Sequence, residues 1–383
     1  MDDARTELMA ESNPTLVGIL KDEISIGGPI TFARFMELAL VHPKHGYYLA
    51  GAARAGFEGD FLTGPETHPI FGAALARQIA ECWDRLGQPE SFVVREAGAG
   101  AGTLARDIMR GLVDERPDVL AALRYELDDV SSVRVADGLA RLANDGFGVQ
   151  VAAASDRPFT GVLLANELLD AFPVHRLIVQ DGDLREMRVA WRDGWFKDEV
   201  LPLSEATLGD SLIGLELAEK QRLEVCPAAQ AWIRGTGSCL EQGFAILIDY
   251  GYPALELYDA RVRFDGTLRT YSQHLVSDDP YRRVGYQDLT AHVDFTAMSR
   301  AAEAGGVNIL GLTSQAFFFA GLGIEELLMK LQTTATDPAD YLNARETIMH
   351  LMEPHGMGRF RVLALGKGVL DDPPLRGMSF VLR

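Results

Sequence analysis

A glycine-rich segment, Glu96-Ala97-Gly98-Ala99-Gly100-Ala101-Gly102-Thr103, lies between two periodic segments of the chain. A short apolar run typical of a buried strand, Phe92-Val93-Val94, precedes it. After it, Leu104, Ile108 and Leu112 recur at helical spacing. Glycine permits a tight turn and close approach of the backbone to a ligand, and the first turn of a helix presents unpaired N–H groups. The stretch therefore predicts a strand, loop and helix that hold a nucleotide-like ligand, with a purely structural turn as the alternative.

The spacing of the glycines separates two ligand classes. A dinucleotide fingerprint requires a third glycine where this chain has Thr103, so the pattern disfavours NAD and FAD. A carboxylate on the next strand should reach the ribose hydroxyls, and that strand is expected to end in Tyr125-Glu126-Leu127-Asp128. Both acids point to one face of the strand. Asp128, nearer the carboxyl end, is the first candidate and Glu126 the second; a solvated charge is the alternative for Asp128.

Short apolar runs separated by helical patterns predict an α/β fold with a parallel sheet. Beyond the first strand, these runs are Val149-Gln150-Val151, Val162-Leu163-Leu164-Ala165 and Phe244-Ala245-Ile246-Leu247-Ile248. Near the end of the chain, Phe360–Leu365 and Ser379–Leu382 are two further candidate strands that could close one sheet edge in antiparallel fashion.

Three parts are expected along the chain. Residues 1–90 form a mainly helical segment, in which Thr31 is an N-cap candidate. Residues 91–175 and 243–383 form the α/β core. Residues 176–242 interrupt the alternation of strands and helices with a pattern typical of a β-hairpin, turning at Asp181-Gly182-Asp183. We interpret 176–242 as an inserted α+β subdomain.

Composition excludes several classes of function. Lys and Arg number 36 against 55 Asp and Glu, and a net charge of −19 has the wrong sign for a protein that binds nucleic acid. Cys82, Cys226 and Cys239 form no Cys-x-x-Cys pair, which argues against a disulfide framework and for a reducing compartment. No complete metal-ligand set is evident, and no apolar run approaches the roughly 20 residues of a membrane helix. Together with the acidic N-terminus, these features predict a cytosolic protein without metal and without a membrane anchor.

The sequence resembles the MidA-like methyltransferase family across nearly its whole length. Besides the glycine-rich stretch, the resemblance rests on Gly28-Pro29-Ile30, Phe35-Met36, Gly46-Tyr47-Tyr48, Gly59-Asp60-Phe61, Thr63, Pro65-Glu66, Asn166–Pro173, Asp249-Tyr250-Gly251, Gly266–Arg269, Asp288–Phe295 and Gln315. The resemblance implies a doubly wound seven-strand Rossmann-like sheet that binds S-adenosyl-L-methionine. Mitochondrial members methylate an arginine of a core subunit of respiratory complex I during assembly. The resemblance therefore implies protein arginine methylation, with a complex I subunit as the partner and an unknown oligomeric state.

The resemblance also implies roles for individual residues. Glu96, Gly98, Gly100 and Gly102 would form the cofactor loop, and Asp128 would occupy the ribose-binding position. The family usually has Glu there, followed by Pro-Ser or Val-Ser, whereas Asp128 is followed by Asp129-Val130.

The segment after the third buried run carries the expected catalytic groups. Methyl transfer is an in-line displacement that depends on positioning, and an acceptor guanidinium needs carboxylates to orient it. Glu167 and Asp170 follow the strand at the carboxyl edge where α/β sheets bind ligands. If the segment turns helically, their spacing places both on one face. Asn166 could position the acceptor or the cofactor's amino group; capping of a turn by Asn166 and Asp170 is the alternative.

Several residues remain open from the sequence. Asp60 belongs either to a cover that the 1–90 segment places over the cofactor or to a simple turn. His292 is a candidate proton acceptor or a structural histidine, and Asp249 and Tyr250 share the same edge of the sheet. Phe317, Phe318 and Phe319 are expected in the core, with a docking ridge as the alternative. A small-molecule methyltransferase and a non-catalytic assembly chaperone are the competing functions.

Overall fold

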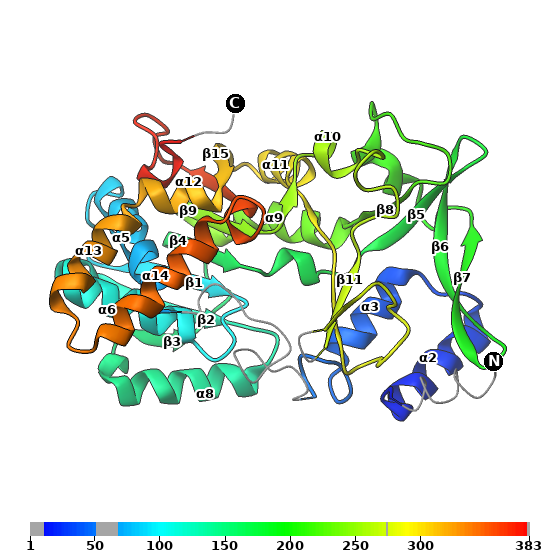
Figure 1. Cartoon of the computed structure of the whole chain (residues 1–383), viewed down its shortest axis with the longest axis horizontal. Coiled ribbons are helices and arrows are strands. Elements are labelled where there is room, and N and C mark those ends of the chain that lie inside the picture. The colour runs from blue at the N-terminus through cyan, green and yellow to red at the C-terminus, as the bar shows by residue number, and fades with distance from the viewer. Residues whose placement is uncertain (1–10, 51–67, 273–274, 381–383) are drawn as a thin grey trace. The chain divides into compact units, whose positions relative to one another are not determined.

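The computed structural model describes residues 11–50, 68–272 and 275–380 (Figure 1). These residues form two compact units. The first unit contains the described residues of Met1–Leu62, Leu169–Ala231 and Gly251–Met298, and the second those of Thr63–Leu168, Trp232–Tyr250 and Ser299–Arg383. Each unit has buried apolar clusters of its own. The division at residues 90, 175 and 242 and the covering role of residues 1–90 stay predictions.

The second unit is built on one sheet of seven strands in the order β15-β16-β9-β4-β1-β2-β3. Its strands are β1 (Phe92–Ala97), β2 (Leu123–Asp128), β3 (Val151–Ala153), β4 (Phe159–Asn166), β9 (Leu240–Asp249), β15 (Asn308–Ser314) and β16 (Arg361–Lys367). Strands β3, β2, β1, β4 and β9 are parallel, whereas β16 is antiparallel to both of its neighbours. The predicted α/β class and doubly wound seven-strand sheet are confirmed.

Helices of the second unit pack around this sheet. They are α5 (Ile70–Arg85), α6 (Thr103–Glu115), α7 (Pro117–Ala122), α8 (Ser132–Leu142), α12 (Gln315–Gly321), α13 (Ile324–Thr334) and α14 (Pro338–Met352), while α9 (Pro227–Cys239) and α11 (Phe295–Ala304) contain residues of both units. Helices α5 and α6 approach closely because glycines stand at their contact. An ideal Cβ on Gly72 would lie 2.6 Å from Asp107 Cβ, and one on Gly111 would lie 2.8 Å from Ala73 Cα.

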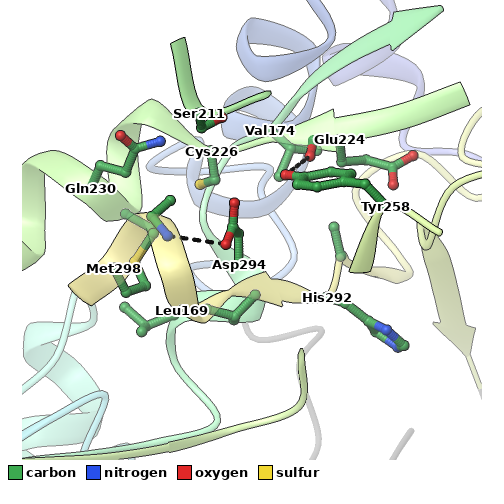
Figure 2. Close-up of a pocket in the computed structure, with 14 residues that line it drawn as sticks. Leu169, Val174, Ser211, Glu224, Cys226, Gln230, Tyr258, His292, Asp294 and Met298 are labelled. Atoms are coloured by element: carbon green, nitrogen blue, oxygen red, sulfur yellow. Dashed lines mark hydrogen bonds between the residues drawn. The ribbon is translucent and has the colours of Figure 1, made fainter. Parts of the chain in front are cut away.

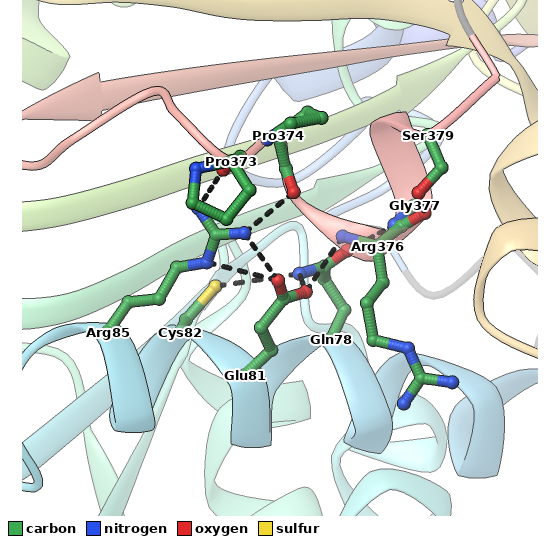
Figure 3. Close-up of polar contacts among 9 residues, drawn as sticks. All are labelled: Gln78, Glu81, Cys82, Arg85, Pro373, Pro374, Arg376, Gly377 and Ser379. Atoms are coloured by element: carbon green, nitrogen blue, oxygen red, sulfur yellow. Dashed lines mark hydrogen bonds and ion pairs between the residues drawn. The ribbon is translucent and has the colours of Figure 1, made fainter.

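The end of the chain is tied to α5 by side chains of that helix (Figure 3). Arg85 donates to the carbonyl oxygens of Pro373 and Pro374, both at 2.6 Å. The Gln78 side chain accepts from Gly377 N at 3.0 Å, and Glu81 accepts from Arg376 N at 2.9 Å. Because these backbone groups belong to an irregular segment, helix side chains supply the partners that a sheet would otherwise provide.

The first unit combines helices α2 (Pro14–Gly27), α3 (Phe32–Val41) and α10 (Ala254–Leu257) with small sheets. A four-stranded antiparallel sheet, in the order β7-β6-β5-β8, contains β5 (His175–Gln180), β6 (Asp183–Arg192), β7 (Trp195–Leu201) and β8 (Arg222–Val225). The other strands are β10 (Gly251–Tyr252), β11 (Arg269–Ser272), β12 (Leu275–Ser277), β13 (Asp288–Thr290) and β14 (Val293–Asp294). The predicted hairpin is confirmed, since Gln180 pairs with Asp183 across a turn in which Asp181 and Gly182 both have positive φ. Thr31 caps α3 as expected by accepting from Arg34 N.

Two strand predictions are wrong at the edges of the sheet. Val149 is 95% exposed in a turn, and β3 begins only at Val151. Ser379 and Phe380 form no strand, while Val381 and Leu382 lie outside the described residues. The antiparallel partner of β16 is instead β15, whose sequence Asn308–Ser314 includes Gly311 and polar residues that weaken its apolar pattern. Strand β16 therefore lies within the sheet rather than at its edge.

Candidate active site

The glycine loop, residues 98–102, joins the carboxyl end of β1 to the start of α6. Gly98, Gly100 and Gly102 have φ values of 74°, 53° and 74°, a left-handed conformation that glycine adopts without steric cost. The N–H groups of Gly98 and Ala99 both donate to the carbonyl oxygen of Asp128, at 2.8 and 3.0 Å. The loop is thus bonded to the end of β2, the strand that carries the expected ribose ligand.

The glycines of the loop differ in the space around them: Gly98 is closely packed, whereas Gly100 has open space beside it. An ideal Cβ on Gly98 would lie 3.1 Å from Leu168 Cδ1, whereas one on Gly100 would meet nothing within 4 Å. Gly102 precedes α6, which begins at Thr103 without a side-chain cap. An uncapped helix start beside an open glycine position is suited to a ligand that approaches the backbone.

Glu96 lies beneath the loop at the end of β1 and is almost fully buried. Tyr125 Oη donates to Glu96 Oε2 at 2.7 Å. Burial raises the pKa of Glu96 to about 8, and the hydrogen bond from Tyr125 opposes this rise. The group therefore titrates near neutral pH, where a bound cation would favour its ionised form.

Asp128 and Glu126 occupy different environments although they lie on the same face of β2. Glu126 is buried and accepts two hydrogen bonds from Arg95, with Arg95 Nη2 at 2.7 Å and Nε at 2.9 Å from Oε2. Asp128 ends the strand, is exposed, and is paired in register with Ala97 at the base of the loop. This arrangement favours Asp128 as the ribose ligand and explains Glu126 as the partner of a buried arginine.

Asp129 is a residue of the site that sequence reasoning did not assign a role. Its Oδ2 accepts from Gly100 N at 2.9 Å, and its Oδ1 accepts from Ser131 N at 2.8 Å. The second contact is a side-chain bond to a backbone group two residues ahead, the turn for which Asp is known. That preference was the available signal, but the contact with the distant Gly100 depends on tertiary structure.

Asn166 and Glu167 lie at the end of β4, next to β1 in the sheet. Asn166 Nδ2 donates to Glu167 Oε1 at 3.2 Å. Glu167 has a positive φ of 49°, and its N–H donates to Ile248 O at 2.8 Å. Asp249 is buried at the end of β9 and accepts from Leu168 N at 3.1 Å. The helical turn expected from Glu167 onward does not form here, because the backbone at Glu167 is left-handed and the short 3-10 helix begins only at Leu169.

Asp170 belongs to the first unit and is buried within that 3-10 helix. Its carbonyl oxygen accepts from Ala291 N at 3.0 Å, next to strand β13. On β13, Asp288 Oδ1 accepts from Tyr48 Oη at 2.7 Å. Burial and then the charges of Asp288 and Asp170 raise the pKa of Tyr48 well above its usual range, so Tyr48 remains a neutral donor. Asp60 lies outside the described residues.

The first unit also contains a small cavity of about 20 Å³ (Figure 2). Its lining includes Glu224, Tyr258, His292 and Asp294. Figure 2 shows the ring of His292 directed away from the other labelled side chains; its backbone N–H donates to Thr267 Oγ1 at 3.1 Å. The cavity has room for a water molecule but not for a nucleoside or a guanidinium group.

The three phenylalanines and the cysteines singled out from the sequence show no sign of a role in catalysis. Phe318 and Phe319 are fully buried as predicted, whereas Phe317 is 44% exposed. Cys82 is buried, and burial raises the pKa of the Cys226 thiol to about 12, so neither resembles a reactive thiolate. No cluster of three metal-ligating side chains occurs among the described residues. None of the helices in the described ranges combines the length and apolar character needed to cross a bilayer.

The second unit therefore has the sheet order, glycine loop and neighbouring acid of an S-adenosylmethionine-dependent methyltransferase. The residues fit that cofactor: an open glycine, an exposed carboxylate one strand away and a buried acid that titrates near neutrality lie at one edge of the sheet. The model of a family of S-adenosyl-L-methionine-dependent methyltransferases matches residues 74–313. The chain belongs to this MidA-like family, uses S-adenosylmethionine and is a methyltransferase.

Named relatives and solved structures match nearly the whole chain. A Drosophila melanogaster protein named protein arginine methyltransferase NDUFAF7 homolog, mitochondrial, is 30% identical over 94% of this chain and 87% of its own length. The human protein arginine methyltransferase NDUFAF7, mitochondrial, is 29% identical over 90% of this chain and 81% of its own length. A COG1565 superfamily member from Burkholderia thailandensis, crystallised with S-adenosyl-homocysteine, has a TM-score of 0.88 at 33% identity, covering 98% of this chain and 97% of its own.

The expectation of a cytosolic protein is wrong. The relatives from fly, rat and human are all named as mitochondrial proteins. The expectation rested on the unpaired cysteines, the acidic N-terminus and the lack of a long apolar run. Unpaired cysteines report a reducing environment but do not identify the compartment that provides it.

Proposed function

We propose that this enzyme transfers a methyl group from S-adenosylmethionine to an arginine side chain of a protein. The observation that carries the proposal is the arrangement at one sheet edge, where the glycine loop, Asp128 and the Asn166–Glu167 pair follow three adjacent parallel strands. The names of the fly and human relatives support arginine as the acceptor. The finer proposal, a respiratory complex I subunit as substrate during assembly, rests on the family resemblance.

In this proposal the protein's own residues mainly orient the two reactants. S-adenosylmethionine supplies, when bound, an electrophilic methyl carbon on a sulfonium. The glycine loop and Asp128 would hold the donor, with Glu96 beneath the loop. Glu167 would orient the acceptor guanidinium by accepting its N–H groups, which localises its charge. Asn166 fixes Glu167 through its 3.2 Å hydrogen bond. The acceptor nitrogen would release one proton to solvent in exchange for the methyl group that the cofactor supplies.

The test compares matched variants on a protein substrate. Purified enzyme, labelled S-adenosylmethionine and the candidate complex I subunit are incubated, and methylated arginine is measured by mass spectrometry. We expect Glu167→Gln to lower kcat about 100-fold, as for loss of an orienting charge, while S-adenosyl-homocysteine binds with unchanged affinity. Glu241→Gln, an exposed acid near the opposite end of β9, is the control and should retain activity.

Two outcomes would reject the proposal. If wild type and Glu167→Gln methylate arginine at the same rate, Glu167 is not a catalytic residue. Methylation of small metabolites with no protein product would replace the arginine acceptor with a small molecule.

A further inference from the structure

Two kinds of hydrogen bond hold the glycine loop: bonds within the backbone, which any sequence can form, and one bond to a side chain, which depends on the residue present. The N–H groups of Gly98 and Ala99 donate to the backbone carbonyl of Asp128, and Gly102 N donates to Ala99 O at 2.9 Å. These bonds do not depend on side chains. The N–H of Gly100, in the middle of the loop, instead donates to a side chain, Asp129 Oδ2, at 2.9 Å.

Gly100 is the position at which the loop most needs such a bond. It has a φ of 53°, stands between two alanines, and no atom lies within 4 Å of where its Cβ would be. Glycine loses more conformational freedom on ordering than any other residue. A charge-assisted hydrogen bond to its N–H therefore restricts the loop without occupying the open face.

The carboxylate of Asp129 is itself held by the helix behind the loop. Its other oxygen accepts from Ser131 N, and Ser131 caps α8 by accepting from Arg134 N at 3.3 Å. Helix α8 packs directly on the loop, because an ideal Cβ on Gly138 would lie 3.1 Å from the carbonyl carbon and oxygen of Ala101. The Asp129 side chain thus joins the loop to the start of the helix that supports it.

We propose that Asp129 is a positioning residue for the cofactor: its carboxylate holds Gly100 in the conformation that receives S-adenosylmethionine. The role goes beyond the proposed arginine methylation and does not depend on the identity of the methyl acceptor. It also gives a function to the position at which this chain departs from the Pro-Ser or Val-Ser pattern of the family it resembles.

The test measures binding and loop order rather than turnover. Calorimetry with S-adenosyl-homocysteine should give about tenfold weaker binding for Asp129→Ala, the size expected for one charge-assisted hydrogen bond. Asp129→Asn keeps one acceptor oxygen, so its affinity for S-adenosyl-homocysteine should lie between those of wild type and Asp129→Ala. In the cofactor-free protein, amide hydrogen exchange of residues 98–102 should be faster in Asp129→Ala than in wild type.

The control separates the hydrogen bond from the negative charge. Asp156 is exposed and adds a negative charge near Asp128, with no hydrogen bond to the loop. Asp156→Ala should therefore bind S-adenosyl-homocysteine within about twofold of wild type. The proposal is overturned if Asp129→Ala binds like wild type, or if Asp156→Ala weakens binding equally. If Asp129→Ala does not fold, Asp129→Asn decides: wild-type affinity together with wild-type exchange of the loop overturns the proposal.

Discussion

Arg95 Nη2 lies 2.7 Å from Glu126 Oε2, and both side chains are buried between neighbouring strands of the sheet. Removing one partner of such a pair leaves an uncompensated charge in the interior. Glu126→Gln should therefore lower the free energy of unfolding by about 3 kcal/mol, measured by urea denaturation, while the folded protein keeps its affinity for S-adenosyl-homocysteine.

Asp128, the exposed acid two residues after Glu126, should affect ligand binding rather than stability. Asp128→Asn should leave the free energy of unfolding within about 0.5 kcal/mol of wild type, as for most surface substitutions, and weaken S-adenosyl-homocysteine binding about tenfold. If Glu126→Gln and Asp128→Asn lose the same affinity, the ribose contact cannot be assigned to Asp128.

Gly100→Ala tests the loop against a matched glycine elsewhere. Gly100 and Gly182, in the turn between β5 and β6, both have positive φ, and both have open space where a Cβ would stand. Each alanine variant should lose about 1 kcal/mol of stability from left-handed strain. Only Gly100→Ala should lose affinity for S-adenosyl-homocysteine, by at least about tenfold as its backbone shifts, measured by calorimetry. Unchanged binding by Gly100→Ala would show that the ligand does not approach this backbone.

Glu96→Gln should change how stability depends on pH. The pKa of Glu96 is about 8 in the folded protein against an ordinary 4.5, so the folded state binds a proton more tightly than the unfolded chain. Its contribution is fully present below pH 4.5 and is lost as the pH rises toward 8. Within that window it lowers the free energy of unfolding by about 1.4 kcal/mol per pH unit. The difference between wild type and Glu96→Gln in urea denaturation should follow this slope; parallel curves would contradict the assignment.

Gly161→Ala tests a close approach inside the sheet. An ideal Cβ on Gly161 would lie 1.8 Å from the Val93 carbonyl oxygen on the adjacent strand, a distance that requires the strands to separate. We expect a loss of at least about 3 kcal/mol or failure to fold. Gly235→Ala, in α9 with nothing within 4 Å, should be neutral or stabilising because alanine favours helix. Comparable thermal stability of the two variants would contradict this reading.

The sequence predicted the second unit well because its signals are local. The apolar runs at Phe92 and Phe244, the glycine stretch and the helical spacing after Thr103 each depend on neighbouring residues, and their order is sufficient for a parallel sheet. The hairpin at Asp181-Gly182 is also local, since the turn residues and the strands stand side by side in the chain. Strand β15 was missed because its pairing with β16, in which Ser314 pairs with Arg361 47 residues further on, dominates over its weak pattern.

Local sequence was sufficient to predict most of the elements and the glycine turn after the first strand, because backbone conformation and hydrophobic period are properties of short segments. Which acids remain available for a ligand depends on contacts between distant residues. Glu126 and Asp128 lie on the same face of their strand, and position along it only ranked Asp128 first; the structure adds that Arg95 on the adjacent strand pairs with Glu126 and leaves Asp128 exposed. In the same way, Asp129 became part of the site only when folding brought its carboxylate to Gly100, because a hydrogen bond between distant residues is set by packing and not by spacing along the chain.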